Sequence, residues 1–289
     1  MAKIDFHAHV APPEIHSGWG RVAQREPYYA QLRGRGRGKF AICEEVISML
    51  NASGFDKAVI FGFGFKDQAL CQLVNDYVIE KTRRFTDRLV GFAAVAPGAK
   101  WAEREIARCH DAGLSGVGEI YPVGQEFDLE RKVETRSLCG ACRERGIPLI
   151  VHVSEPVGKS HPGKTASDLG KIERFVSNNQ GLRIVLAHFG GGLMFYESMP
   201  ELREKFRDVY YDTAAAPLLY NKRVYSAAIA LGLGAKLLFG SDFPMLRPSR
   251  YMEALKCLER EDRDLILGAN AESLLSAGAP IKIAAEDEG

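Results

Sequence analysis

Apolar residues cluster in eight short runs along the chain, and each run is rich in residues that favour β-strands. Runs such as PLIVHV are apolar at nearly every position, which is typical of strands buried on both faces of a parallel sheet. The stretches between the runs, for example Asp67–Phe85, repeat their apolar residues at helical spacing. The pattern therefore predicts alternating strands and helices. The predicted strands are Lys3–His9, Lys57–Phe63, Arg88–Val95, Leu114–Ile120, Ile147–Ser154, Leu182–His188, Val209–Thr213 and Ala235–Ser241.

The spacing of these runs predicts the architecture. Most intervals between the starts of consecutive runs have the length of one strand–helix unit. Eight such units predict an α/β fold, a closed (β/α)8 or TIM barrel, as a single domain over residues 1–289. A doubly wound open sheet is the alternative. The first interval is longer by about one unit, which predicts an inserted loop or lid at about residues 11–43, and the acidic tail 284–289 is expected to fray.

Composition narrows the classes of protein. The chain has 289 residues, is 46% hydrophobic and carries a net charge of +1, which is ordinary for a soluble globular protein and disfavours nucleic-acid or anionic-membrane partners. Its apolar runs fall short of the roughly 18 residues of a membrane span. The start of the chain lacks the features of a secretory signal, and the six Cys have no framework spacing. We therefore expect a cytoplasmic protein with a small-molecule substrate, and homo-oligomerisation stays open.

Four of the seven histidines fall at the carboxyl ends of predicted strands. His7 and His9 end the first strand, His152 lies near the end of the fifth, and His188 ends the sixth. In a barrel, all these ends open onto the same mouth. Residues two apart on a strand face the same side, so His7 and His9 can bind one ion. A hydrogen-bonded core histidine is the alternative for any one of them.

Two carboxylates occupy equivalent places. Glu119 ends the fourth predicted strand, in GVGEIYP, and Asp242 follows the eighth, in FGSDFP. Imidazole and carboxylate ligands together suit zinc and neighbouring divalent ions. The convergence of both residue types at one end of a barrel predicts a metal site there.

The motifs that carry these residues stand in chain order: DFHAH at residues 5–9, VHVSEP around His152, AHFGGG around His188 and GSDFP around Asp242. They resemble the amidohydrolase superfamily, in particular the amidohydrolase-related (amidohydrolase 2) family, which includes metal-dependent hydrolases and decarboxylases. The resemblance implies one divalent metal on His7, His9 and Asp242, usually zinc, with manganese as the alternative. His152 then joins that site or binds a second ion, and His188 binds metal or contacts the substrate.

Glu119 raises the question of metal number. Many members of the superfamily carry a carboxylated lysine on the fourth strand, which bridges two metals. GVGEIYP is instead similar to the Glu-bearing fourth strand of TatD-like metal-dependent phosphodiesterases. A carboxylate can bridge two cations in the same way, so we expect one or two ions. The alternative is that Glu119 orients a ligand histidine.

The resemblance implies hydrolysis of an ester, lactone, amide or related bond in a small organic substrate. A divalent ion would lower the pKa of water, and Asp242 would act as general base and then as acid. His188 is the next candidate for the base. Non-oxidative decarboxylation of a small or aromatic acid on the same site is the alternative reaction.

Basic residues near the mouth are candidate contacts for an anionic substrate. Gly158–Thr165 matches the phosphate-loop pattern GxxxxGK[ST], but Pro162 removes a backbone donor that such a loop could use. Nucleotide binding is therefore disfavoured, and an exposed basic loop is the alternative. The candidate substrate-binding residues are Arg33, Arg35 and Arg37 in the insertion, Tyr121 two residues after Glu119, and Lys159, His161 and Lys164 in the fifth loop.

Overall fold

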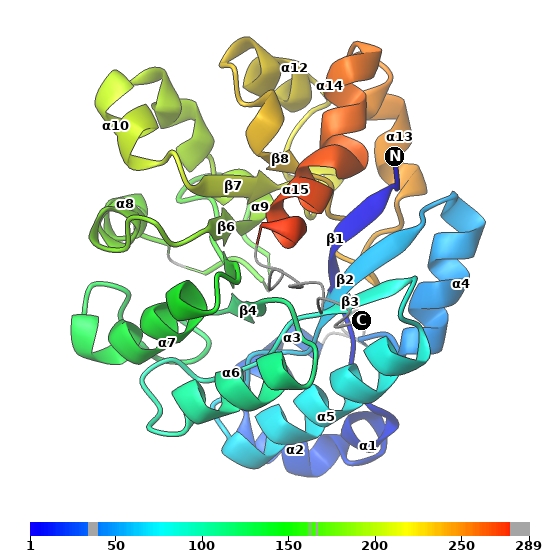
Figure 1. The fold of residues 1–289 in the computed structure, drawn as a ribbon, viewed down its shortest axis with the longest axis vertical. Helices are drawn as coiled ribbons and strands as arrows, with labels where there is room; N and C mark the ends of the chain where they lie inside the picture. The colour runs from blue at the N-terminus through cyan, green and yellow to red at the C-terminus, as the bar shows by residue number, and fades with distance from the viewer. Residues whose placement is uncertain (34–39, 162, 166, 278–289) are drawn as a thin grey trace, which may run out of the picture.

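The computed structural model describes residues 1–33, 40–161, 163–165 and 167–277. In this part of the chain, short strands form a central ring and helices surround it (Figure 1). The strands are β1 (Ile4–His9), β2 (Lys57–Phe61), β3 (Leu89–Gly91), β4 (Val117–Ile120), β5 (Leu149–Val151), β6 (Ile184–Leu186), β7 (Val209–Asp212) and β8 (Leu237–Leu238).

Parallel pairing closes these strands into a barrel. β1, β2 and β3 pair in order, as do β4 to β8. A bridge between Ala93 and Val117 joins the two sets on one side. On the other side, the backbone N–H of Phe6 donates to the carbonyl of Phe239 at 2.7 Å, and Ala8 bridges to Phe243. The predicted (β/α)8 barrel is confirmed.

The helices follow the strands in chain order. They are α1 (Pro13–Ser17), α2 (Trp19–Arg25), α3 (Pro27–Arg33), α4 (Cys43–Ser53), α5 (Gln68–Arg84), α6 (Ala102–Asp111), α7 (Lys132–Glu144), α8 (Leu169–Asn178), α9 (Ala187–Gly190), α10 (Pro200–Lys205), α11 (Ala216–Leu219), α12 (Arg223–Ala230), α13 (Ser249–Leu255), α14 (Arg260–Asp264) and α15 (Asn270–Ser276). The short helical turns are η1 (Leu193–Ser198), η2 (Gly234–Lys236) and η3 (Leu265–Ala269).

The hydrogen-bonded strands are shorter than the apolar runs that predicted them. β5 covers only Leu149–Val151, and β8 only Leu237–Leu238. Every residue of β5 and β6 is buried, as expected for strands covered on both faces. Several runs, among them those of β5, β6 and β8, continue beyond the strand into the loops at the carboxyl end of the barrel. Polar side chains that follow a strand therefore sit at that end.

The helix predicted at Asp67–Phe85 shows how local chemistry sets an element. α5 begins after Asp67, whose side chain accepts a hydrogen bond from the backbone N–H of Leu70 at 3.0 Å. Its last turn carries Lys81, Arg83 and Arg84, whose charges favour a helix C-terminus. Asp67 is the capping residue and Phe85 ends the helix, so the structure and the periodicity agree on this element.

The insertion after β1 contains the three short helices α1, α2 and α3. Glu26, between α2 and α3, is 2% exposed, and its Oε1 accepts the backbone N–H groups of Lys66 and Asp67 at 2.9 and 2.8 Å. The insertion is therefore attached to the loop that joins β2 to α5. Arg33 is the last residue of α3, whereas Arg35, Arg37 and the tail 284–289 lie outside the described residues.

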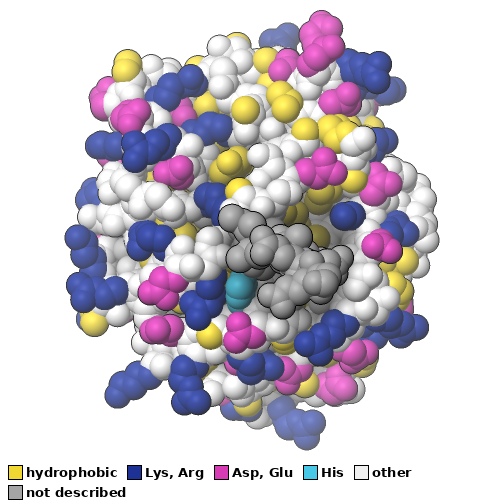
Figure 2. Space-filling view, viewed as in Figure 1, with side chains coloured by type: hydrophobic (Ala, Val, Ile, Leu, Met, Phe, Trp, Pro, Cys, Tyr) yellow, Lys and Arg dark blue, Asp and Glu magenta, His cyan; other side chains and the backbone are white. Residues whose placement is uncertain are grey.

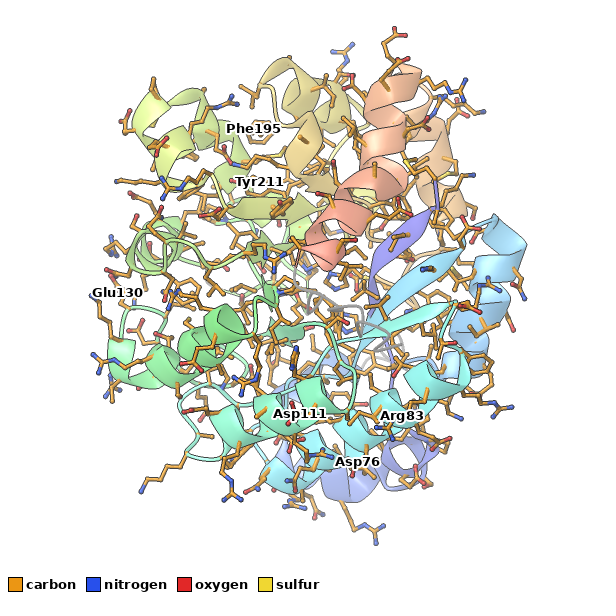
Figure 3. The ribbon with its side chains drawn as sticks, viewed as in Figure 1. Asp76, Arg83, Asp111, Glu130, Phe195 and Tyr211 are labelled. Atoms are coloured by element: carbon orange, nitrogen blue, oxygen red, sulfur yellow. The ribbon has the colours of Figure 1, made fainter. Side chains whose placement is uncertain are left out.

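Side chains divide clearly between the core and the surface. Tyr211, on β7, lies inside, while Asp76, Arg83 and Asp111 lie on the outer helices α5 and α6 (Figure 3). On the face shown in Figure 2, cationic and anionic side chains are interspersed. Among the helices of the described part, none has the length and apolar character that crossing a membrane requires.

Candidate metal centre

His7 and His9 open the site from β1. Both side chains are buried, and their Nε2 atoms lie 3.1 Å apart, as their spacing on a strand predicts. The ring of Phe61, on β2, packs edge-on against both imidazoles, with centroid distances of 5.0 Å. The ring of Phe40 stacks on that of His9, with a centroid distance of 4.9 Å. These aromatic contacts hold the two imidazoles with their Nε2 atoms together.

Asp242 joins them from the turn that follows β8. Its backbone N–H donates to the carbonyl of His7 at 3.0 Å, and its φ of 59° lies in the left-handed region. Such a conformation is strained for a residue other than glycine and is common at functional sites. Here it brings Oδ1 to 3.3 Å from Nε2 of His9 and 3.9 Å from Nε2 of His7. These three side chains form the first ligand group.

Glu119, His152 and His188 form a second ligand group from β4, β5 and β6. Nδ1 of His152 lies 2.8 Å from Oε1 of Glu119 and 3.3 Å from Nε2 of His188. His188 lies two residues beyond the end of β6, with a φ of 58°. Its backbone N–H donates to Oδ1 of Asp212 at 2.9 Å, which fixes this turn.

Glu119 lies between the two groups. Its Oε2 is 3.5 Å from Nε2 of His7 and 3.6 Å from Nε2 of His9, while its Oε1 faces His152. The side chain is 1% exposed. Each oxygen of one buried carboxylate is thus directed to a different ligand group.

The hydrogen bonds of two histidines show what the centre can bind. Nδ1 of His7 donates to Oδ2 of Asp212 at 2.9 Å, and Nδ1 of His188 donates to the carbonyl of Ala214 at 3.0 Å. In the neutral imidazoles the lone pairs are therefore on Nε2, and both point at Glu119. A lone pair and a carboxylate oxygen repel each other unless a cation lies between them. The donor set therefore fits divalent cations.

The electrostatics agree with this fit. Burial lowers the pKa of His7, but the charges of Asp212 and Glu119 outweigh it and hold this pKa well above its usual value. Burial also opposes the shift at His188, whose pKa is raised to about 9 by its hydrogen bond to Glu119 and by that charge. Burial raises the pKa of Asp242, but the hydrogen bond to His9 and the nearby imidazoles lower it to about 2. Glu119 thus favours a positive charge on the imidazoles around it, and a cation bound to their Nε2 atoms would supply the same charge.

The predicted substrate-binding residues have different surroundings in the structure. The hydroxyl of Tyr121 donates to Oε2 of Glu119, and its side chain is 5% exposed. The ammonium of Lys164 donates to carbonyls within its own loop, those of Val157 and Gly158. Burial lowers the pKa of His161, with smaller contributions from neighbouring charged groups that include His188. Lys159 is exposed.

Two buried carboxylates were not predicted from the sequence. Asp212 ends β7 and orients both His7 and His188. Asp5 accepts hydrogen bonds from the backbone N–H and the hydroxyl of Ser241, and so ties β1 to the turn before Asp242. Asp212 had a usable signal, because it is the last residue but one of the seventh apolar run, as Glu119 is of the fourth.

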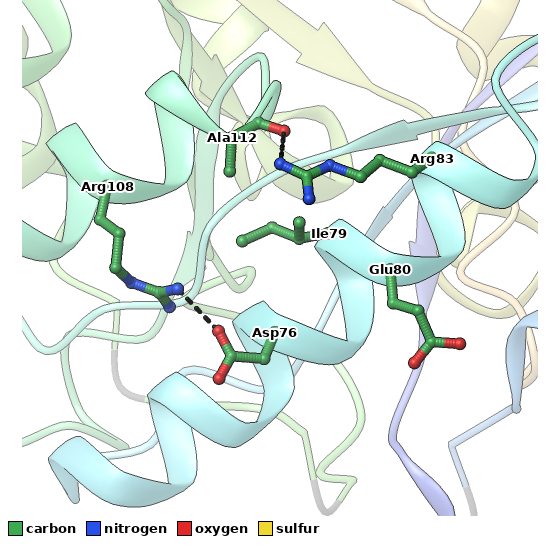
Figure 4. A pocket seen from close by; sticks show the side chains of 6 residues that line it. All are labelled: Asp76, Ile79, Glu80, Arg83, Arg108 and Ala112. Carbon is green, nitrogen blue, oxygen red and sulfur yellow. Dashed lines mark hydrogen bonds and ion pairs between the residues drawn. The ribbon is translucent and has the colours of Figure 1, made fainter.

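A shallow pocket lies elsewhere, between α5 and α6 (Figure 4). Its cations already have partners: Arg108 pairs with Asp76 at 2.7 Å, and Arg83 donates to the carbonyl of Ala112 at 3.3 Å. The convergent side chains at the barrel mouth, which could hold metal ions, make the stronger candidate for function.

Comparisons with known proteins agree with this architecture. A family model described as Amidohydrolase matches residues 4–276. No curated protein matches the chain. The structure of 5-carboxyvanillate decarboxylase from Sphingomonas paucimobilis has a TM-score of 0.75 and 14% identity, and the match covers 95% of this chain and 99% of that chain.

A second solved structure also shares the fold. It is a dihydroxybenzoic acid decarboxylase from Polaromonas sp. JS666, with bound manganese and the inhibitor 2-nitroresorcinol. The TM-score is 0.72 and the identity 16%, and the match covers 96% of this chain and 98% of that chain. At such identities the likeness establishes the fold alone.

Proposed function

Because the chain belongs to the amidohydrolase family, we propose that it is a metal-dependent hydrolase. Its substrate would be a small organic molecule, and the bond cleaved an ester, lactone, amide or related bond. The observation that carries the proposal is the position of Glu119, whose two oxygens are divided between two groups of potential ligands. Such a carboxylate suits a pair of divalent ions, and paired ions are typical of hydrolytic centres.

The six side chains have distinct roles in this proposal. His7, His9 and Asp242 would hold one ion, His152 and His188 the other, and Glu119 would serve both. Bound divalent ions supply two kinds of chemistry: they lower the pKa of water and polarise the bond under attack. Zinc suits these ligands, and manganese is the alternative.

Asp242 is the proposed general base. Its carboxylate is ionised at neutral pH, because its pKa is held at about 2, and it stands at the edge of the first ligand group. It would accept a proton from the attacking water and transfer it to the leaving group. His188 would contact the substrate or complete the second ligand group.

Decarboxylation is the second candidate function. Proteins with the same fold include decarboxylases of aromatic acids, one of them with bound manganese. A substrate of this kind is anionic, which agrees with the predicted basic contacts at the mouth. The same ligand set would serve both reactions, so the released product distinguishes them.

The deciding experiment loads the purified protein with zinc or manganese and screens lactones, esters, amides and aromatic acids. Proton release and carbon dioxide are measured together. We expect proton release without carbon dioxide from an ester or lactone, or amine release without carbon dioxide from an amide, whose hydrolysis releases no net proton at neutral pH. Carbon dioxide from an aromatic acid would favour decarboxylation, and no turnover of any compound in either metal form would count against both reactions.

Metal counting tests the shared carboxylate. The variant Glu119→Gln should reduce bound metal towards half and lower activity strongly. Glu80→Gln, an exposed position on α5, makes the same change of charge away from the site and should keep both at the wild-type level. A wild-type protein that binds only one ion at saturating metal would contradict the paired centre.

A further inference from the structure

Tyr121 follows β4 directly, two residues after Glu119. Its hydroxyl donates a hydrogen bond to Oε2 of Glu119, the oxygen that faces His7 and His9. The other oxygen, Oε1, faces His152 at 2.8 Å. We propose that Tyr121 is a positioning residue that fixes this carboxylate with one oxygen towards each ligand group. The inference rests on the proposed function, in which Glu119 serves both groups.

Packing makes the Tyr121 hydroxyl a fixed donor. Its ring stacks on those of Phe63 and His152, with centroid distances of 4.9 and 4.8 Å and interplanar angles of 28° and 26°. The side chain is 5% exposed. A buried ring stacked on two others cannot swing its hydroxyl away from Glu119 without disturbing Phe63 or His152.

The backbone of Tyr121 is also held in place, by a hydrogen bond to Gln125. Its N–H donates to Oε1 of Gln125 at 2.9 Å. The amide nitrogen of Gln125 donates in turn to the carbonyls of Val95 at 2.8 Å and Phe65 at 3.2 Å. These carbonyls lie in the loops after β3 and β2, so Gln125 ties Tyr121 to the loops that follow these two strands.

The chemistry of the hydroxyl suits this role. A phenol hydroxyl is protonated at neutral pH, so it donates to the carboxylate, which can only accept. A hydrogen bond to a carboxylate is among the stronger ones and has a preferred direction. Without it, the torsions of the Glu119 side chain would let both oxygens turn towards the same ligand group.

The loss of such an orienting contact typically costs 10–100-fold in metal affinity. We therefore expect Tyr121→Phe, which removes only the hydroxyl, to bind metal about 10–100-fold more weakly. Tyr28→Phe is the matched control. The ring of Tyr28 lies 6.0 Å from that of Tyr121, and its buried hydroxyl has no hydrogen-bond partner in the described structure.

The test uses cobalt(II) as the probe. Wild type, Tyr121→Phe and Tyr28→Phe are stripped of metal and titrated with cobalt, with affinity measured by calorimetry and ligand geometry by visible absorption. Tyr121→Phe should show weaker binding and an altered spectrum, whereas Tyr28→Phe should match wild type. Tyr121→Met, which fills the same apolar space with a flexible side chain, should behave as Tyr121→Phe does and serves if that variant folds poorly.

Two results would overturn the inference. One is cobalt affinity and spectrum unchanged in Tyr121→Phe. The other is a fall in cobalt affinity in Tyr121→Phe together with a metal-free form that melts at a clearly lower temperature than metal-free Tyr28→Phe. The hydroxyl would then support the fold and not the orientation of the carboxylate. A third result separates the two proposals. If Tyr121→Phe changes cobalt affinity and spectrum as expected but the wild-type protein hydrolyses none of the compounds, the proposed function is contradicted and the role of Tyr121 is retained.

Discussion

Asp212 and His7 form a buried pair at the base of the metal centre. Oδ2 of Asp212 lies 2.9 Å from Nδ1 of His7, and both side chains are 0% exposed. The other oxygen, Oδ1, accepts the backbone N–H groups of His188 and Ala214 at 2.9 and 3.0 Å. One carboxylate thus selects the tautomer of a ligand from the first group and fixes the backbone of a ligand from the second.

Replacing this carboxylate should weaken metal binding by both ligand groups. Asp212→Asn keeps the shape but removes the charge, and its amide can accept on only one side. We expect metal affinity to fall about 10–100-fold, because the orientation of His7 is no longer enforced. Competition with a chelator of known affinity measures the change. Asp208→Asn, in the turn before β7, is a control for the lost charge, and equal affinities of the two variants would disprove the orienting role.

Asp242 should matter more for turnover than for substrate binding. Asp242→Asn keeps one oxygen near His9 but cannot accept the proton, and loss of a general base typically costs about 10²–10⁴ in rate. Steady-state kinetics should therefore show a large fall in kcat with a smaller change in KM, after metal content has been checked. A near-normal kcat in Asp242→Asn would show that Asp242 is not the general base, and His188 would be the next candidate.

The periodicity of the chain was sufficient to predict the barrel. Continuous apolar runs separated by helical patterns have few arrangements in which all strands are buried, and the closed barrel is one of them. The same reasoning placed Glu119, His152 and Asp242 at one end, because that position depends only on which residue follows a strand. The structure places Glu119 and His152 in one group of potential ligands and Asp242 in the other.

The supporting contacts could not be predicted in this way. Asp212 and His7 are 205 residues apart, and Glu26 contacts Lys66 and Asp67 from 40 and 41 residues away. Such pairs depend on how the loops pack at the barrel mouth, which hydrophobic periodicity does not encode. Tyr121 was expected to contact substrate because it follows Glu119, and the local rule could not show that its hydroxyl turns back to that carboxylate.

The arginines of the insertion give a prediction about substrate charge. Replacing Arg33, Arg35 and Arg37 with Gln should raise KM for acidic substrates, because guanidinium groups bind carboxylates in a bidentate manner. Neutral analogues and metal content should be unaffected. Kinetics with matched acidic and neutral substrates measure the effect. An unchanged KM together with loss of an oligomer in sedimentation would instead assign the segment to a subunit interface.

Glu26 gives a prediction about the attachment of the insertion. Glu26→Ala leaves the N–H groups of Lys66 and Asp67 without their acceptor, and an unpaired buried donor costs about 1–3 kcal/mol. Limited proteolysis should therefore cut the insertion faster than in wild type, while metal content is retained. Glu14→Ala, an exposed glutamate on α1 of the same insertion, is the control. Equal cleavage rates in the two variants would show that Glu26 does not hold the segment.

The pH dependence of stability gives a second test at Glu26. Burial raises the pKa of its carboxyl above the usual 4.5, against the lowering effect of its hydrogen bonds to the backbone N–H groups of Asp67 and Lys66 and of the Lys66 charge. The folded state therefore holds the proton more tightly than the unfolded state, so this group's contribution to stability declines as the pH rises from 4.5 through the raised pKa. Glu26→Gln keeps an acceptor oxygen but cannot ionise, so it should lose this decline. Denaturant unfolding across the acidic range measures it, and parallel curves for wild type and Glu26→Gln would show that Glu26 titrates alike in both states.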